Sequence, residues 1–166
     1  GSQSVSEREQ AAGDVSDELP PVRVMKRQPT ATELEHWTVA CVAVCDVVHL
    51  FLEDFTAECN KQGSRLFARA FALLHMLFVH ATSELVPHLY STLHLVVHRF
   101  RQPLFAHSDN SYCEVLTYLI LSHCNSRSAQ RHSRARALYF GLLMANYEEA
   151  SNFSKIKLQS IIAVSK

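Results

Sequence analysis

Glycine is scarce in this chain, and the motifs that mark many enzymes are missing. Only four of the 166 residues are glycine, which suits helices joined by short turns and leaves little material for glycine-rich loops. The sequence contains no Gly-x-Ser-x-Gly, no Gly-x-Gly-x-x-Gly, no phosphate-binding loop and no His-Glu-x-x-His. These absences predict a chain with no catalytic residues, no metal site and no cofactor.

A surplus of charge of either sign is also lacking. The 16 basic and 16 acidic side chains cancel to a formal net charge of zero. A balanced chain does not build the positive field that attracts nucleic acid or an acidic membrane surface, so nucleic acid is not an expected partner. Charged residues make up 19% of the sequence, below the usual share of about a quarter. We therefore expect much of this chain to be buried, in its own core or against neighbouring protein.

The cysteines do not form a disulfide framework, because their number is odd and their spacing irregular. They are Cys41, Cys45, Cys59, Cys113 and Cys124. A reducing, cytoplasmic environment is the simpler interpretation, and the polar N-terminus shows no secretory signal. The most apolar stretch, residues 37–52, contains Asp46 and His49 and is too short to span a bilayer. It predicts a buried core helix and no integral membrane segment.

Two regions differ in composition. Residues 1–31 are rich in Ser, Glu, Gln and Pro and poor in large apolar side chains, so they predict a disordered linker. Over residues 32–166 apolar side chains recur every three or four positions, which is the period of a helix. Thr32 and Glu35 have the spacing of a capping box and mark the first helix start. No segment alternates in the manner of a strand, so the fold class is all-α with about six helices.

Turn residues divide this region. The first helix runs from Thr32 to Gln62, whole or broken in two, and ends at Gly63-Ser64. The next helices begin at Ser64, at Ser83, after the polar cluster 108–111, at Ala129 and at Ser154, and the last is expected to run to Lys166. The side chains predicted to face inward, helix by helix, are Leu34, Trp37, Cys41, Cys45, Val48, Leu52 and Phe55; Leu66, Ala70, Phe71, Leu74, Leu77 and Phe78; Leu85, Leu89, Leu93, Val96 and Phe100; Val115, Leu116, Leu119, Ile120 and His123; Ala135, Leu138, Leu142 and Ala145; and Ile156, Ile161, Ile162 and Val164.

The helix starts are evenly spaced. Ser64, Asp109 and Ser154 lie 45 residues apart, which is the period of HEAT and armadillo helix pairs. This spacing predicts a short α-solenoid of two or three stacked, armadillo- or HEAT-like helix pairs. A plain orthogonal helix bundle is the alternative architecture.

One group of side chains has metal-ligand chemistry. Cys41, Cys45 and His49 are spaced i, i+4 and i+8, so thiolates and an imidazole would follow one helix face, as zinc ligands can. The same cysteines lie in the apolar stripe, where a free cysteine behaves as a small buried hydrophobe. No paired cysteine motif supplies a fourth ligand, so the core interpretation is favoured.

Histidine and arginine are also clustered. His94 and His98 lie off the apolar stripe of their helix and are predicted to face solvent or a partner. The fifth helix carries a basic run: Arg127, Arg131, His132, Arg134 and Arg136. Arg127, Arg131 and Arg134 lie on one side of this helix. Their aliphatic stems are expected to cover the core while the guanidinium groups reach solvent or a neighbouring helix. A nucleic-acid site would need more basic residues with interleaved aromatics.

The C-terminal third resembles a known family. Residues 134–148 read RARALYFGLLMANYE and residues 152–165 read NFSKIKLQSIIAVS. An alanine-rich helix with a Leu/Tyr/Met run, an Asn-Phe turn and a Lys-x-Gln segment is similar to the DOCK (dedicator-of-cytokinesis) exchange factors, where their armadillo-like region enters the DOCKER domain. Zizimin-like and neighbouring subfamilies fit best. The likeness is clearest over residues 112–166 and compatible over 37–111, and departures such as Gly141 indicate a distant member.

The resemblance implies a parent protein that exchanges GDP for GTP on Rac- or Cdc42-like Rho GTPases. In that family the exchange surface lies C-terminal to the matched stretch, so no catalytic residue can be carried over. Lys155, Lys157 and Gln159 match family positions with no catalytic role, and we expect them on an exposed face. The chain is then a non-catalytic helical scaffold segment.

The expected partners of such a segment are neighbouring domains of the same chain, a second copy in a homodimer, and the GTPase through the downstream domain. Two other functions stay open. One is an independent HEAT- or armadillo-like protein-interaction adaptor. The other is a metal- or redox-responsive helical protein that uses Cys41, Cys45 and His49.

Overall fold

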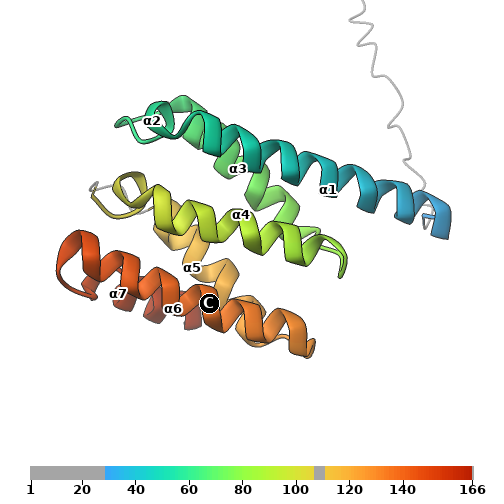
Figure 1. The fold of residues 1–166 in the computed structure, drawn as a ribbon. Coiled ribbons are helices and arrows are strands. Elements are labelled where there is room, and N and C mark those ends of the chain that lie inside the picture. The colour runs from blue at the N-terminus through green and yellow to red at the C-terminus, as the bar shows by residue number, and fades with distance from the viewer. Residues whose placement is uncertain (1–28, 107–110, 166) are drawn as a thin grey trace, which may run out of the picture.

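The computed structural model describes residues 29–106 and 111–165, and every regular element in these two stretches is a helix (Figure 1). The all-α prediction is therefore confirmed. The elements are α1 (Ala31–Asp54), α2 (Thr56–Cys59), α3 (Arg65–Val79), α4 (Leu85–Arg99), the π-helical turn η1 (Gln102–Ala106), α5 (Ser111–Cys124), α6 (Ala129–Ala150) and α7 (Ser154–Val164). Most of the predicted linker, and residues 108–110 of the predicted polar cap, lie outside the described residues.

The helices are stacked in two layers. Helices α1, α4 and α6 lie side by side in one layer, and α3, α5 and α7 lie behind them (Figure 1). Helix α4 packs against α1 on one side and α6 on the other, while α5 packs against both α6 and α7. The arrangement is a short solenoid-like stack, with α1 at one end and α6 with α7 at the other.

Helix α1 starts earlier than predicted. The hydroxyl of Thr30 accepts a hydrogen bond from the Glu33 amide at 3.2 Å, and the Glu33 carboxylate accepts one from the Thr30 amide at 2.7 Å. The capping box is therefore Thr30 with Glu33, and the assignment to Thr32 with Glu35 was wrong. Both threonines have an acidic residue three positions later, so the spacing alone did not distinguish them.

Other boundaries follow the turn residues. The predicted first helix is broken in two at Phe55, which separates α1 from α2. Gly63 has a positive φ of 68°, a left-handed conformation that glycine adopts without strain, and the Ser64 hydroxyl then caps α3 by accepting from the Phe67 amide at 3.3 Å. Helix α7 begins at Ser154 as predicted but ends at Val164, before the expected end at Lys166.

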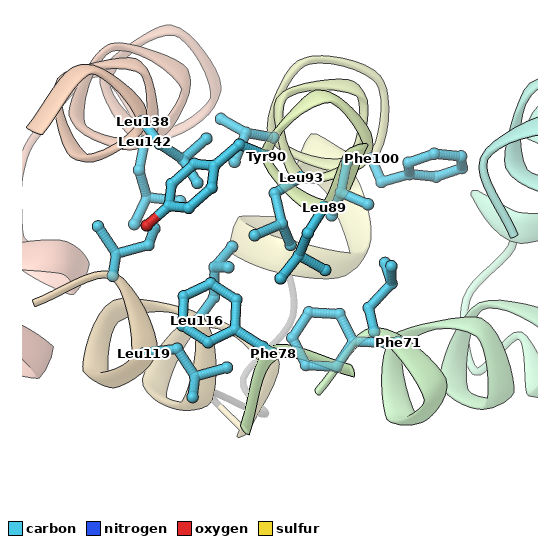
Figure 2. Close-up of a cluster of buried hydrophobic side chains, with 14 of the residues drawn as sticks. Phe71, Phe78, Leu89, Tyr90, Leu93, Phe100, Leu116, Leu119, Leu138 and Leu142 are labelled. Atoms are coloured by element: carbon cyan, nitrogen blue, oxygen red, sulfur yellow. The ribbon is translucent and has the colours of Figure 1, made fainter. Parts of the chain in front are cut away.

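The core runs through the middle of the stack. Figure 2 shows side chains of α3, α4, α5 and α6 meeting between the two layers, with Leu89 and Tyr90 of α4 near their centre. The predicted inward residues of α4 (Leu85, Leu89, Leu93, Val96 and Phe100) and of α6 (Ala135, Leu138, Leu142 and Ala145) are all buried. These predictions are confirmed, since α4 packs against α1 and α6, and α6 packs against α4, α5 and α7.

The end helices depart from the predicted pattern. Several side chains expected to face inward are exposed: Leu34, Trp37, Phe55, Leu66, Ile161 and Val164. Helix α1 has 24 residues whereas α3 and α4 have 15 each, so these shorter helices cannot cover its whole stripe. Gln159, expected on an exposed face, is instead buried. A helical period finds a stripe, but only the neighbouring elements decide how much of it is covered.

Candidate functional site

The sulfur-containing stripe of α1 is an interhelical contact. Cys41 and Cys45 are buried and His49 is half-buried. The Thr92 hydroxyl of α4 lies 3.6 Å from the Cys45 sulfur and 3.1 Å from His49 Nδ1. Burial raises the pKa of the Cys45 thiol, which disfavours the thiolate that a metal would need. These residues therefore tie α1 to α4.

A second polar contact joins α1 to α4, since His88 Nδ1 lies 2.9 Å from the Asp46 carboxylate. Within α1, His49 Nε2 lies 3.8 Å from the Glu53 carboxylate. Among the residues that the structure describes, no three His, Cys, Asp or Glu side chains gather as metal ligands. These contacts position α1 against α4.

A second histidine cluster lies between the layers. The His123 ring is stacked on Phe78 with centroids 4.1 Å apart, and its Nδ1 lies 3.0 Å from the Tyr90 phenol oxygen. Burial, with Arg131 as a second cause, lowers the pKa of His123 to about 4. The ring is therefore neutral near pH 7, and a neutral imidazole serves here as a packing group that joins α3, α4 and α5.

The exposed histidine pair was only partly predicted. The rings of His94 and His98 are stacked with centroids 6.3 Å apart. His98 is exposed, but His94 is half-buried, and its burial lowers its pKa, with smaller contributions from His98 and Arg134. His94, predicted like His98 to face solvent or a partner, is thus partly covered by the fold.

The basic side chains of α6 and α7 are used in different ways. Arg131 reaches the loop between α3 and α4, where it donates from Nη2 to the Ala81 carbonyl at 2.6 Å. This guanidinium group therefore contacts a loop, whereas the prediction was a neighbouring helix or solvent. Lys155 donates to the Phe105 carbonyl at 2.9 Å. Arg134 and Arg136 are exposed.

A groove along α1 was not predicted. It has a volume of ≈ 680 Å³ and lies between the first turns of α1 and the loop before α4. Its lining residues are Leu34, Glu35, Thr38, Val39, Val42, Thr82, Ser83 and Glu84. The groove has an apolar floor with two carboxylates, and its size is that of a small-ligand or side-chain pocket. The signal in the sequence was that α1 is apolar on several sides, whereas a surface helix usually has one apolar stripe.

The outer side of α1 is apolar and uncovered. Val39, Val44, Val47 and Leu50 are all exposed. Within the described residues, α1 is the one helix whose length and composition would allow it to cross a membrane, and 17% of its most apolar window is buried. The prediction of a buried core helix therefore holds for one face only.

Comparisons with known proteins place this helical stack in a larger context. The chain is 29% identical over 151 residues to dedicator of cytokinesis protein 11 of Danio rerio. This match covers 83% of this chain and 7% of that protein. It is 25% identical over 128 residues to dedicator of cytokinesis protein 7 of Homo sapiens, and 24% identical over 128 residues to the Mus musculus protein of that name. Each of these two matches covers 77% of this chain and 6% of the relative.

Neither a family model nor a solved structure matches the chain. All three relatives are dedicator of cytokinesis proteins, and each match covers 77% to 83% of this chain. The chain itself spans only 6% to 7% of the length of these relatives. By its sequence, this helical chain is related to the dedicator-of-cytokinesis family.

Proposed function

We propose that this chain is a non-catalytic, armadillo-like scaffold segment of a DOCK-type guanine nucleotide exchange factor for Rac- or Cdc42-like Rho GTPases. The observation that carries the proposal is the similarity to dedicator of cytokinesis proteins 11 and 7 over 77% to 83% of the chain. Exchange on the GTPase is then performed by a downstream DOCKER domain, and the protein acts in the cytoplasm in small-GTPase signalling.

The contacts between the described helices favour a structural role for this chain. Three histidines join helices to each other: His49 with Thr92, His88 with Asp46, and His123 with Tyr90. Such contacts fix the positions of helices, as a scaffold requires. On this proposal the neighbouring domains of the same protein are the direct partners, and the GTPase is a partner only through them.

A chimaera tests this role. Residues 29–165 replace the matched segment of human dedicator of cytokinesis protein 7, and exchange of fluorescent GDP is measured on Rac and Cdc42. We expect exchange by the chimaera and none by the 166-residue chain alone, with a chimaera carrying a flexible linker of equal length as the inactive control. Exchange by the 166-residue chain alone would show that the catalytic surface lies in this chain and not in a downstream domain. If the chimaera with the flexible linker were as active as the chimaera with residues 29–165, the scaffold role would be excluded.

An independent helical adaptor is the second candidate function, and the α1 groove favours it. The apolar floor with Leu34, Val39 and Val42, edged by Glu35 and Glu84, has the character of a groove for an apolar side chain next to a basic one. A library of basic, apolar-containing peptides can be screened for binding. Binding that is lost on Val39→Glu, together with an inactive chimaera, would favour the adaptor.

A further inference from the structure

The α1 groove combines exposed apolar side chains with two carboxylates. Leu34 and Val39 line it and are 49% and 68% exposed, so the described helices leave much of this apolar surface uncovered. Glu35 of α1 and Glu84 of the loop before α4 line the same groove. An apolar surface edged by charge of one sign is typical of a site that binds a peptide segment of the opposite charge.

No Lys or Arg of α1 balances the carboxylates of the groove. Residues 29–60, which include α1 and α2, contain six acidic residues and no Lys or Arg. In the loop before α4, Arg131 donates to the Ala81 carbonyl, but Arg131 is not among the residues that line the groove. The groove is therefore an acidic and apolar surface, and its ligand should be basic and apolar.

A segment of this composition directly precedes α1 in the chain. Residues 22–27 read VRVMKR, which is three apolar and three basic residues with no acid. This basic character is confined to the segment, since residues 1–21 contain five acidic residues and one Arg. The valines and the methionine suit the apolar floor of the groove, and the basic residues suit its carboxylates.

The segment is long enough to reach the groove. Helix α1 begins at Ala31, and the groove follows it from Leu34 to Val42. At 1.5 Å per residue, Val42 is about 17 Å from the start of the helix. An extended chain covers about 3.3 Å per residue, so six residues span about 20 Å. A chain that reverses at residues 28 and 29 therefore places residues 22–27 alongside the groove.

We propose that residues 22–27 bind in the α1 groove of the same molecule, with their apolar side chains against Val39 and Val42 and their basic side chains next to Glu35 and Glu84. The connection to α1 is only a few residues long, so the effective concentration of the segment at the groove is in the range of about millimolar. A weak contact is then sufficient to keep the groove occupied.

This contact has a consequence for other ligands. A basic, apolar peptide of another protein must displace residues 22–27 before it can enter the groove, so the segment acts as an internal competitor. Such a peptide and the same segment of a second copy are the competing occupants, and both lack the advantage of the short connection. The inference does not depend on nucleotide exchange, since it rests on the groove and the segment alone.

A labelled peptide tests whether the groove recognises this segment and is already occupied by it. The probe is a fluorescein-labelled peptide with the sequence of residues 20–28, PPVRVMKRQ, and fluorescence anisotropy follows its binding to the 166-residue chain. In the charge-reversed chain, Arg23→Glu, Lys26→Glu and Arg27→Glu are combined, so that its own segment leaves the groove. This chain should bind the peptide about tenfold more tightly than the wild type, in which few molecules have an open groove.

Two lysine substitutions in the charge-reversed chain locate the binding site. Val39→Lys places a charge of the same sign as that of the peptide on the floor of the groove, so binding should be lost. Val47→Lys is the matched control, because Val47 is also exposed on α1 but does not line the groove. This second variant should bind the peptide like the charge-reversed chain itself.

Disulfide formation tests the contact within one molecule. Val24→Cys is combined with Val39→Cys in the groove, or with Ala40→Cys as the control. Ala40 is exposed and is two residues from both Thr38 and Val42, so a turn of about 200° places it on the opposite side of α1. On mild oxidation of dilute protein, mass spectrometry of the peptides should show that position 24 links to position 39 about tenfold faster than to position 40. The linked product should be a monomer.

Four outcomes would overturn the inference. Equal affinity of the wild type and the charge-reversed chain for the peptide would show that residues 22–27 do not occupy the groove. No binding to the charge-reversed chain, or binding that survives Val39→Lys, would show that the groove does not recognise the segment. Disulfides that form equally fast at positions 39 and 40 would show that the segment does not dock. Disulfide-linked dimers would assign the groove to the segment of a second copy.

Discussion

The phenol oxygen of Tyr90 lies 3.0 Å from Nδ1 of His123, where it links α4 to α5 inside the stack. Both groups are held in their neutral forms, since burial raises the pKa of Tyr90 and lowers that of His123. A neutral imidazole can accept a hydrogen bond at Nδ1, whereas a protonated one cannot. The contact therefore makes folding sensitive to pH.

Stability should fall as the pH is lowered through the range set by His123. Its pKa is about 4 in the folded chain, compared with the ordinary value of 6.5. Above pH 6.5 the ring is neutral in both states, so its full contribution is present. Between pH 6.5 and 4 the unfolded chain binds a proton that the folded chain does not, so the free energy of unfolding decreases. The melting temperature, followed by circular dichroism, should decline across this window.

His123→Gln provides the control for this pH dependence. Glutamine does not titrate and retains an acceptor for the Tyr90 hydroxyl, so the decline between pH 6.5 and 5 should be shallower in this variant. His94 also has a lowered pKa and should leave a residual slope. Identical slopes in the wild type and His123→Gln would show that His123 titrates normally.

The start of α1 can be tested by two threonine substitutions. Thr30 makes the capping box with Glu33, whereas Thr32 lies within the helix. Thr30→Ala removes the side-chain acceptor and should lower the free energy of unfolding by about 1 kcal/mol. Thr32→Ala should be neutral or slightly stabilising, because alanine is the better helix former. Urea unfolding of both variants measures the difference. A larger loss of stability in Thr32→Ala than in Thr30→Ala would show that Thr32 is the N-cap, as the sequence predicted.

The sequence predicted best the helices that have neighbours on both sides. The stripe from Leu85 to Phe100 repeats every three or four residues and is fully buried, because α4 lies between α1 and α6. The same rule failed at Trp37 and Ile161, which lie on the end helices. The period of apolar residues does not show whether a neighbouring helix exists to cover them, so Trp37 and Ile161 are exposed.

The contacts between helices lie beyond the reach of local patterns. Thr92 bonds to His49 across 43 positions of the chain, and Arg131 bonds to Ala81 across 50. Neither partner could be chosen from spacing, because the choice depends on how α1, α4 and α6 are placed side by side. The α1 groove has the same origin, since its walls come from α1 and from the loop before α4.

Asn146 is a polar residue whose removal should stabilise the fold. It is fully buried on α6, and neither its Nδ2 nor its Oδ1 has a hydrogen-bond partner among the described residues. A buried polar group without a partner loses its hydration with no compensation. Asn146→Leu keeps a side chain of similar shape and should raise the free energy of unfolding by about 1 kcal/mol.

Chemical denaturation measures the effect of Asn146→Leu, with Thr117→Val as the matched substitution on α5. Thr117 is also fully buried, but its hydroxyl interacts with the Cys113 thiol. Thr117→Val loses this contact, so it should stabilise the fold less than Asn146→Leu does. A loss of stability in Asn146→Leu would show that the amide makes hydrogen bonds beyond those of the described residues.

The five thiols should react in two groups. Four cysteines are buried, and their burial raises the pKa of each thiol: Cys41, Cys45, Cys59 and Cys113. Cys124 is only half-buried, and although burial raises its pKa too, Arg136 acts in the opposite direction. Since the thiolate is the reactive form and must be accessible, Ellman's reagent at pH 8 should modify Cys124 first.

Two serine variants are the controls for this reaction. Cys124→Ser should remove the fast phase, whereas Cys59→Ser should leave it intact. The other thiols should react only as fast as the stack opens. Rapid modification of Cys41 or Cys45 instead would mean that α1 separates readily from α4, and that the Thr92 contacts do not hold the first helix in place.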